Sequence, residues 1–162
     1  INVRPPTRPK NISRINHIGS TSVPGLIAKP TIDILLEIPT DADIPSLTTA
    51  LISAGYICNM QPNNPAPHLM FMKGYTPQGF RGQAVHLHVR FPGDWDELYF
   101  RDYLRSHPET AKSYGKLKQN LQLRYEHDRD AYTEAKTDFI QEATRLARKE
   151  MGNKYTTPST TL

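Results

Sequence analysis

The sequence has few of the features that stabilise small secreted domains or hold a chain in a membrane. Its 162 residues include one cysteine, Cys58, which excludes an internal disulfide and a cysteine-rich zinc site. We expect Cys58 to be a half-buried structural residue. No apolar run approaches the ~20 residues that a membrane-spanning helix needs, and no segment resembles a signal peptide. We therefore expect a cytoplasmic protein without a membrane partner.

Acidic residues are absent from the first thirty positions, although the whole chain contains 16 of them. The same stretch carries five basic side chains: Arg4, Arg8, Lys10, Arg14 and Lys29. Residues 93–162, in contrast, hold 12 basic and 12 acidic residues, so the formal net charge of +4 comes entirely from residues 1–92. This uneven distribution favours an anionic partner that approaches the N-terminal part of the chain.

Hydrophobic patterning predicts a single α/β (α+β) domain over residues 14–151, with a small mixed sheet first and helices afterwards. The expected strands are 14–18, 31–38, 56–60, 69–73 and 84–91. The expected helices are 43–54, 94–106, 108–125 and 129–151. Flanking and connecting segments are an extended, proline-containing arm at 1–13, a flexible connection at 74–82 and a polar tail at 152–162.

A loop rich in glycine and hydroxyl side chains runs from His17 to Gly25. Such a loop gathers backbone N–H groups and three hydroxyls, and its glycines adopt conformations that other residues avoid. These features are typical of a phosphate-binding loop. An ordinary Ser/Gly-rich turn is the alternative, and the spacing does not match the Walker pattern. The candidate phosphate contacts are His17, Gly19, Ser20, Thr21, Ser22 and Lys29.

One acidic residue, Asp33, lies inside the apolar strand expected at 31–38. Burying a carboxylate is costly unless it is paired or binds a metal, so we expect a functional role for Asp33. Glu37 points the same way, but at ~3.3 Å per residue it lies about 13 Å further along the strand. That is too far for both carboxylates to bind one metal directly. Near the end of the strand, Glu37 is interpreted as a solvated side chain.

Alternation in the strand expected at 84–91 places His86, His88 and Arg90 on one face. Two histidines spaced i, i+2 could ligate a metal or bind an anion. The alternative is the half-exposed polar face of an antiparallel sheet. Together with the loop and Asp33, these residues predict a site for a phosphate-bearing substrate.

The run from His17 to Ile34 closely resembles the signature of the GrpB family. Further matching segments are His86–Val89, Tyr99–Arg105 with His107-Pro108, Tyr114 with Leu117-Lys118, and Tyr132-Thr133 with Lys136. The resemblance extends over about residues 14–150, and related domains occur fused to dephospho-coenzyme A kinase. It implies a fold of the polymerase-β-like nucleotidyltransferase superfamily.

That superfamily combines a Gly-Ser motif with a strand bearing two acids spaced i, i+2 and a third acid on a nearby strand. Together the acids hold two magnesium ions. Gly19-Ser20 matches the motif and Asp33 the first acid, which makes Asp33 the expected metal ligand. Leu35 occupies the second acid position, and the third falls on the strand with the two histidines. The resemblance thus implies a nucleotide or phosphorylated small molecule as partner, Mg²⁺ if the protein is catalytic, and an incomplete acidic set.

A second resemblance is to arginine-containing cyclodipeptide synthases, which use aminoacyl-tRNA and carry an Asp-x-x-x-Glu strand pattern. Asp33 and Glu37 match this pattern, and a tRNA partner would suit the basic first thirty residues. Three functions are therefore open: nucleotidyl transfer, tRNA-dependent peptide-bond formation, and nucleotide binding without catalysis. For the catalytic functions the candidate residues are Asp33, Glu37, His86 and His88.

Three pairs of residues in the family pattern are spaced i, i+4, so each pair lies on one helix face. They are Arg101/Arg105, Tyr114/Lys118 and Tyr132/Lys136. Arg101, Lys118 and Lys136 are candidate substrate contacts. The alternative is that these side chains are amphipathic and fix the helices in place.

Overall fold

The structure is a computed structural model that describes residues 12–156. Most of the expected arm (1–11) and the end of the expected tail (157–162) lie outside the described residues. The chain divides into two compact units. Within the described residues, the sheet unit comprises residues 12–17 and 30–93, and the helical unit comprises residues 18–29 and 94–156. The expected domain at 14–151 therefore contains two parts, each with a core of its own.

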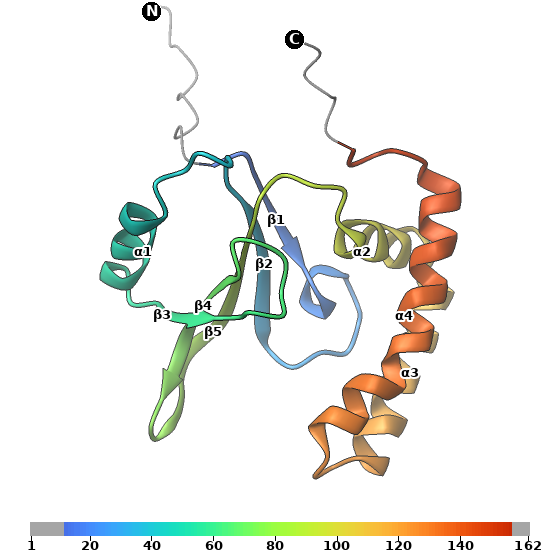
Figure 1. The fold of residues 1–162 in the computed structure, drawn as a ribbon. Coiled ribbons are helices and arrows are strands. Elements are labelled where there is room, and N and C mark those ends of the chain that lie inside the picture. The colour runs from blue at the N-terminus through green and yellow to red at the C-terminus, as the bar shows by residue number, and fades with distance from the viewer. Residues whose placement is uncertain (1–11, 157–162) are drawn as a thin grey trace, which may run out of the picture. The chain divides into compact units, whose positions relative to one another are not determined.

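The sheet unit is built on a five-stranded sheet with the order β1-β2-β5-β4-β3 (Figure 1). The strands are β1 (Arg14–Ile18), β2 (Thr31–Glu37), β3 (Ile57–Met60), β4 (Leu69–Thr76) and β5 (Gly79–Arg90). β2 pairs with β5 in parallel, whereas β4 pairs with both β3 and β5 in antiparallel fashion. The predicted mixed sheet is thereby confirmed.

Helix α1 (Ile44–Ser53) packs against one face of this sheet. It begins after the N-cap Asp43, whose carboxylate accepts a hydrogen bond from the Ser46 N–H at 3.0 Å, as capping aspartates do. The sheet presents six buried side chains to α1: Leu36, Ile38, Leu69, Phe71, Leu87 and Val89. Side chains alternate along a strand, so the polar residues between them point to the opposite face. The expected alternation around His86 and His88 is confirmed.

The expectation of a flexible connection at 74–82 is wrong. β4 and β5 run through this segment as a hairpin, in which Thr76 pairs with Gly79. The ladder shifts register at Gly74, which has φ +89°. A Cβ at this position would lie 2.5 Å from the carbonyl oxygen of Gln83. Only glycine accommodates this conformation and this close approach, so the glycine marks a β-bulge rather than a loop.

The described part of the helical unit contains a short 3-10 turn and three helices. They are η1 (Ser20–Ser22), α2 (Asp96–Ser106), α3 (Pro108–Arg124) and α4 (Arg129–Met151). The helices confirm the expected ranges, except that α2 begins two residues later, with Trp95 as its N-cap. Pro108 is the first residue of α3. The N–H of a first residue has no partner within the helix, so proline can lack it without loss of a hydrogen bond. Within residues 12–156, no helix combines the length and the apolar character needed to cross a membrane.

Two buried clusters stabilise the helical unit. One packs Val23 against Leu104, Ala111 and Tyr114. The other joins α2 to α4 through Tyr99, Tyr103, Ala143 and Ala147. Tyr155, from the described part of the expected tail, packs against this second cluster. The beginning of the tail is therefore part of the folded unit.

Candidate functional site

The polar face of the sheet brings Asp33, His86 and His88 together. Asp33 lies opposite His86 in the parallel register of β2 and β5. Its Oδ1 atom is 3.2 Å from His86 Nδ1 and 3.3 Å from His88 Nε2. The three candidate ligand atoms all lie within 4.8 Å of one another. The side chains of Asp33, His86 and His88 are 28%, 22% and 24% exposed, so a small ion or molecule could reach them.

A fourth side chain in this cluster, Tyr75, is not among the residues predicted from the sequence. Its hydroxyl lies 2.6 Å from His86 Nε2, and its ring stacks on the imidazole with the centroids 5.7 Å apart. Strict alternation along β4 would place Tyr75 on the face of Phe71, in contact with the core, but the bulge at Gly74 reverses its direction. The signal in the sequence is the isolated glycine inside a strand pattern.

Glu37 lies on the same face of β2 but makes a different set of contacts. Its carboxylate is fully buried and ion-paired with Arg14, whose Nη2 donates to Oε1 at 2.8 Å and whose Nε donates to Oε2. The Gly93 N–H donates to Oε1 at 3.0 Å. The interpretation of Glu37 as a solvated side chain is therefore wrong, because its lone pairs are satisfied by protein donors. A catalytic role for Glu37 stays a prediction, and these contacts give it no support.

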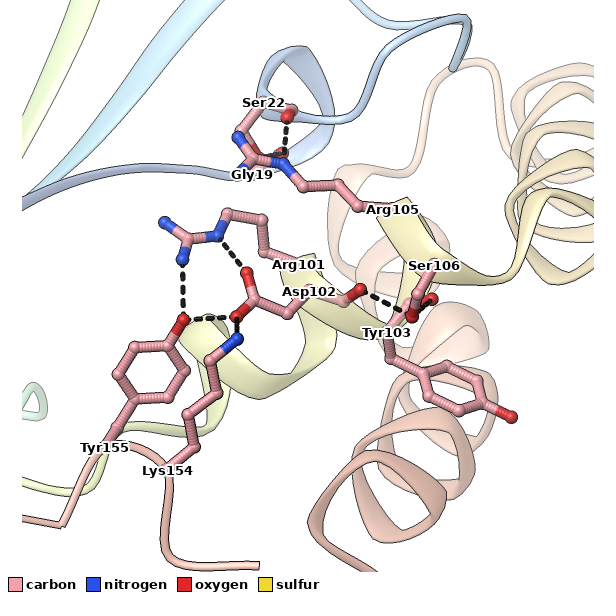
Figure 2. Close-up of polar contacts among 9 residues, drawn as sticks. All are labelled: Gly19, Ser22, Arg101, Asp102, Tyr103, Arg105, Ser106, Lys154 and Tyr155. Atoms are coloured by element: carbon pink, nitrogen blue, oxygen red, sulfur yellow. Dashed lines mark hydrogen bonds and ion pairs between the residues drawn. The ribbon is translucent and has the colours of Figure 1, made fainter. Parts of the chain in front are cut away.

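The predicted phosphate-binding loop forms the turn η1 in the helical unit. Gly19 precedes the turn with φ 71°, a conformation that favours glycine. Ser22 Oγ donates to the Gly19 carbonyl at 2.5 Å, and Arg105 Nε donates to the Ser22 carbonyl at 2.8 Å. Figure 2 shows that the first contact lies within the turn, whereas the second connects the turn to α2. Arg105 therefore acts as a support for the loop.

Lys118 connects the same loop to α3. Its Nζ atom donates to Ser20 Oγ at 2.9 Å and to the Ile27 carbonyl at 2.6 Å. Burial, and then the charge of Lys136, lower the pKa of Lys118 to about 8. Burial also lowers the pKa of Lys136, and the charges of Lys29 and Arg129 lower it further. Ser20, Lys29, Lys118 and Lys136 thus form one basic cluster of the helical unit.

The i, i+4 pairing of tyrosine with lysine is confirmed on both α3 and α4. Lys118 Nζ lies 5.1 Å from the ring centroid of Tyr114, and Lys136 Nζ lies 4.4 Å from that of Tyr132. Burial, together with the nearby Tyr132, raises the pKa of Tyr114 to about 12, so this phenol stays neutral. Cation–π contact with the two rings offsets part of the free-energy cost of removing the lysine ammonium groups from water. The rings supply no negative charge, and the basic cluster keeps its net charge.

A groove of about 930 Å³ adjoins this cluster within the helical unit. It lies between the segment 24–27 and the facing parts of α2 and α3, with Leu26, Ile27 and Ala111 among its apolar lining. Arg105, Lys112 and Lys116 also line it. Ile27 belongs both to the groove and, through its carbonyl, to the contacts of Lys118. This groove could not be predicted from the sequence, because its walls come from segments that are about 80 residues apart along the chain.

Arg101, a predicted substrate contact, is buried in a hydrogen-bond network between α2 and residues 154–155 (Figure 2). Its guanidinium donates to Asp102 at 2.8 Å and to the Tyr155 hydroxyl at 3.0 Å. Lys154 and the Tyr155 hydroxyl also donate to Asp102. Burial raises the pKa of Asp102, but the hydrogen bonds from Lys154, Tyr155 and Arg101 outweigh it and hold that pKa below its ordinary value. The network gives Arg101 a structural role, and a substrate contact stays a prediction.

The other predicted residues occupy varied positions. His17 and Lys29 are exposed, whereas Thr21 is half-buried. Arg90 lies opposite Glu37 in the register of β2 and β5. The structure thus assembles Asp33, His86 and His88 in the sheet unit. It assembles Gly19, Ser20, Ser22, Lys29, Lys118 and Lys136 in the helical unit.

A family model described as "GrpB protein" matches residues 4–146. The chain belongs to the GrpB family. It is 43% identical over 128 residues to a UPF0157 protein of Pseudomonas aeruginosa, covering 78% of this chain and 52% of that protein. The chain therefore spans about half the length of this relative.

A solved structure, that of the conserved protein GrpB from Enterococcus faecalis, is similar with a TM-score of 0.71 and 31% identity. The match covers 86% of this chain and 82% of that one. A protein named dephospho-CoA kinase from Mycolicibacterium paratuberculosis is 26% identical over 83% of this chain, which spans 38% of that kinase. These similarities support the expected family and the mixed α/β fold with a helical C-terminal half.

Proposed function

We propose that this chain binds a nucleotide or another phosphate-bearing substrate through the basic cluster of the helical unit. The observation that carries the proposal is the pair Lys118 and Lys136, two partly buried lysines whose pKa values are lowered by burial and by neighbouring positive charges. Among residues 12–156, no ion pair joins either of them to a carboxylate. A bound anion would stabilise the charged forms of both lysines, which burial and neighbouring positive charges destabilise.

The loop supplies further donors for phosphate oxygens. An ammonium group has three N–H donors, and Lys118 uses two of them on Ser20 and Ile27. The third donor, the Ser20 hydroxyl and the exposed ammonium of Lys29 are available for phosphate oxygens. The adjoining groove, with its apolar residues and three basic side chains, suits a ligand that combines an organic part with phosphate.

The relatives named dephospho-CoA kinase point in the same direction, because dephospho-CoA is a phosphate-bearing molecule. The resemblance to nucleotidyltransferases adds transfer of a nucleotidyl group as the reaction to test. The two-magnesium arrangement of that superfamily, however, does not fit this chain. The second acid position is Leu35, which is fully buried, and imidazoles occupy the neighbouring strand. We therefore derive no step through magnesium.

Isothermal titration of the full chain with ATP, ADP, inorganic pyrophosphate and adenosine tests the proposal. Binding that requires phosphate, with adenosine far weaker than ATP, is the expected result. Equal binding of adenosine and ATP, or no binding of any phosphate compound at low salt, would overturn it. A parallel titration with tRNA covers the cyclodipeptide synthase alternative. Strongly salt-dependent tRNA binding, without competition by ATP, would favour that alternative.

A further inference from the structure

We propose that Asp33, His86 and His88 bind one divalent transition-metal ion, with Zn²⁺ as the best-fitting example. The ligand atoms would be Asp33 Oδ1, His86 Nδ1 and His88 Nε2. Two imidazoles with one carboxylate suit zinc and its neighbours in the first transition row. Magnesium prefers oxygen ligands and retains its waters. The site thus differs in kind from the acidic set that the nucleotidyltransferase resemblance implies.

The two separations measured from Asp33 Oδ1 agree with this metal class. Tetrahedral zinc with ligands at 2.0–2.1 Å separates neighbouring ligand atoms by roughly 3.3–3.4 Å. The observed separations from Asp33 Oδ1 are 3.2 Å to His86 Nδ1 and 3.3 Å to His88 Nε2. An octahedral magnesium site would bring adjacent ligands to roughly 2.9 Å. For direct N–H···O hydrogen bonds the observed separations are long, since such bonds centre on about 2.9–3.0 Å.

Tyr75 supplies the outer contact that a metal-bound histidine usually has. Its hydroxyl lies 2.6 Å from His86 Nε2. If Nε2 carries the proton and donates to Tyr75, the lone pair of Nδ1 faces Asp33, where the metal would lie. The alternative is a metal-free cluster in which Nδ1–H donates to Asp33 and Nε2 accepts from Tyr75. The two arrangements require opposite tautomers of His86, so they can be distinguished directly.

Three protein ligands leave one position of a tetrahedral ion open, as in catalytic rather than structural zinc sites. The partial exposure of all three side chains gives that position access to water or to a small ligand. The backbone around the site is held by the ladder of β2, β5 and β4, which fixes the ligand spacing. This inference goes beyond the proposed function and rests on residues of the sheet unit alone.

Titration of the chelator-treated full chain with Co²⁺ and Zn²⁺ tests the inference. We expect one equivalent of Co²⁺ to produce the intense visible absorption of a tetrahedral site, to be displaced by one equivalent of Zn²⁺ and to be unaffected by millimolar Mg²⁺. Asp33→Asn and His88→Gln should each weaken Co²⁺ binding at least 100-fold. Tyr75→Phe should weaken it about tenfold, as expected for loss of an outer contact.

Matched controls come from outside the cluster. His127→Gln, at a side chain that is 92% exposed, and Asp41→Asn, at an exposed residue, should leave Co²⁺ affinity unchanged. The double variant Lys118→Met, Lys136→Met should bind the metal normally even if it no longer binds nucleotide, which separates this inference from the proposed function. Circular dichroism of each variant checks that the fold is intact.

Nuclear magnetic resonance of the histidine side chains gives an independent measurement. With ¹¹³Cd²⁺ as the probe, couplings to His86 Nδ1 and His88 Nε2 are expected, with a proton on His86 Nε2. No Co²⁺ or Cd²⁺ binding, binding unchanged in Asp33→Asn and His88→Gln, or Mg²⁺ competition at equal concentration would each overturn the assignment.

Discussion

The sheet unit and the helical unit carry polar clusters of opposite character. In the sheet unit, one carboxylate faces two imidazoles, and a second carboxylate is neutralised by Arg14. In the helical unit, the charge of Lys136 acts on Lys118 and that of Lys29 acts on Lys136, and tyrosine rings are the cation–π partners of Lys118 and Lys136. The first arrangement has electron-pair donors and suits a cation. The second has an excess of positive charge and suits an anion.

Burial therefore has different electrostatic consequences in the two units, depending on whether the buried charge has a partner of opposite sign. Glu37 is completely buried, yet its partners satisfy it, so it behaves as part of the scaffold. Lys118 and Lys136 are only partly buried, but burial and neighbouring positive charges destabilise the charged form of each. An incompletely compensated cluster of this kind is where a ligand has the most to contribute. The following variants test this comparison, from the largest expected effect to the smallest.

Asp33→Asn should have the largest effect if the protein transfers nucleotidyl groups. We expect turnover of an α-³²P-labelled nucleoside triphosphate to fall at least 1,000-fold, on the order of 4 kcal/mol. ATP affinity and the fold should be retained, because Asp33 belongs to the sheet unit and the basic cluster belongs to the helical unit. Unchanged turnover in this variant would remove Asp33 from the reaction.

Glu37→Gln should destabilise the protein far more than Asp33→Asn. It removes the negative charge from a buried ion pair with Arg14, a loss of about 3 kcal/mol in the free energy of unfolding. Asp33→Asn should change that free energy by less than about 1 kcal/mol in metal-free protein. Urea denaturation of both variants measures the difference, and equal stabilities would contradict the scaffold role of Glu37.

The double variant Lys118→Met, Lys136→Met should weaken ATP binding about 100-fold, since each charged contact contributes roughly 1.5 kcal/mol. The methionines retain most of the apolar stem, so the helices should still pack. Arg145→Met is the matched control, because this arginine is exposed and paired with Glu142. Titration calorimetry measures the affinities, and equal loss in the control would indicate a non-specific charge effect.

Gly74→Ala tests the bulge that turns Tyr75 toward His86. The new Cβ would meet the Gln83 carbonyl at 2.5 Å with φ +89°, so we expect destabilisation of about 2 kcal/mol. The protonation pattern of His86 should change with it. Gly79→Ala is the matched control, because Gly79 also has a positive φ of +108° but leaves open space for a Cβ, and it should leave His86 unaffected. Nuclear magnetic resonance of His86 in both variants provides the measurement.

The smallest predicted effect is the pH dependence of anion binding. The pKa of Lys118 is lowered to about 8, so the free protein loses this charge above that pH, while a bound anion would raise the pKa again. ATP affinity should be about fourfold weaker at pH 8.5 than at pH 7, with proton uptake on binding near pH 8. Titration in two buffers of different ionisation enthalpy detects that uptake. If proton uptake on ATP binding persists in Lys118→Met, a group other than Lys118 takes up the proton.

Lys118 affects folding stability in the opposite direction: ATP affinity should fall as the pH rises, whereas the free energy of unfolding should rise. Because its pKa is lowered in the folded state, the unfolded chain binds more protons between about pH 8 and pH 10.4. The free energy of unfolding therefore rises with pH through this window as far as Lys118 is concerned. Comparing the wild type with Lys118→Met by denaturation at pH 7 and pH 9.5 isolates this contribution.

Sequence patterns predicted much of the fold for identifiable reasons. Alternation located the strand with His86 and His88, and the helical period located α4, because both periods follow from local backbone geometry. The segment 74–82 was misassigned as a flexible connection, since its glycines indicate a turn as readily as a bulged hairpin. The sequence does not predict the place of Tyr75 for the same reason, because the ladder shifts register between Lys73 and Tyr75 and strict alternation no longer holds beyond it.

The amino-acid sequence by itself determined the family, the order of strands and helices, and the position of an ionisable Asp33 within an apolar strand. These features depend on local periodicity and on a specific run of residues. Tertiary structure alone decided which polar groups meet: Asp33 with two imidazoles, Glu37 with Arg14, and Lys118 with Ser20. The physical reason is that charge, burial and hydrogen bonding depend on neighbours distant in the chain, which sheet register and helix packing select.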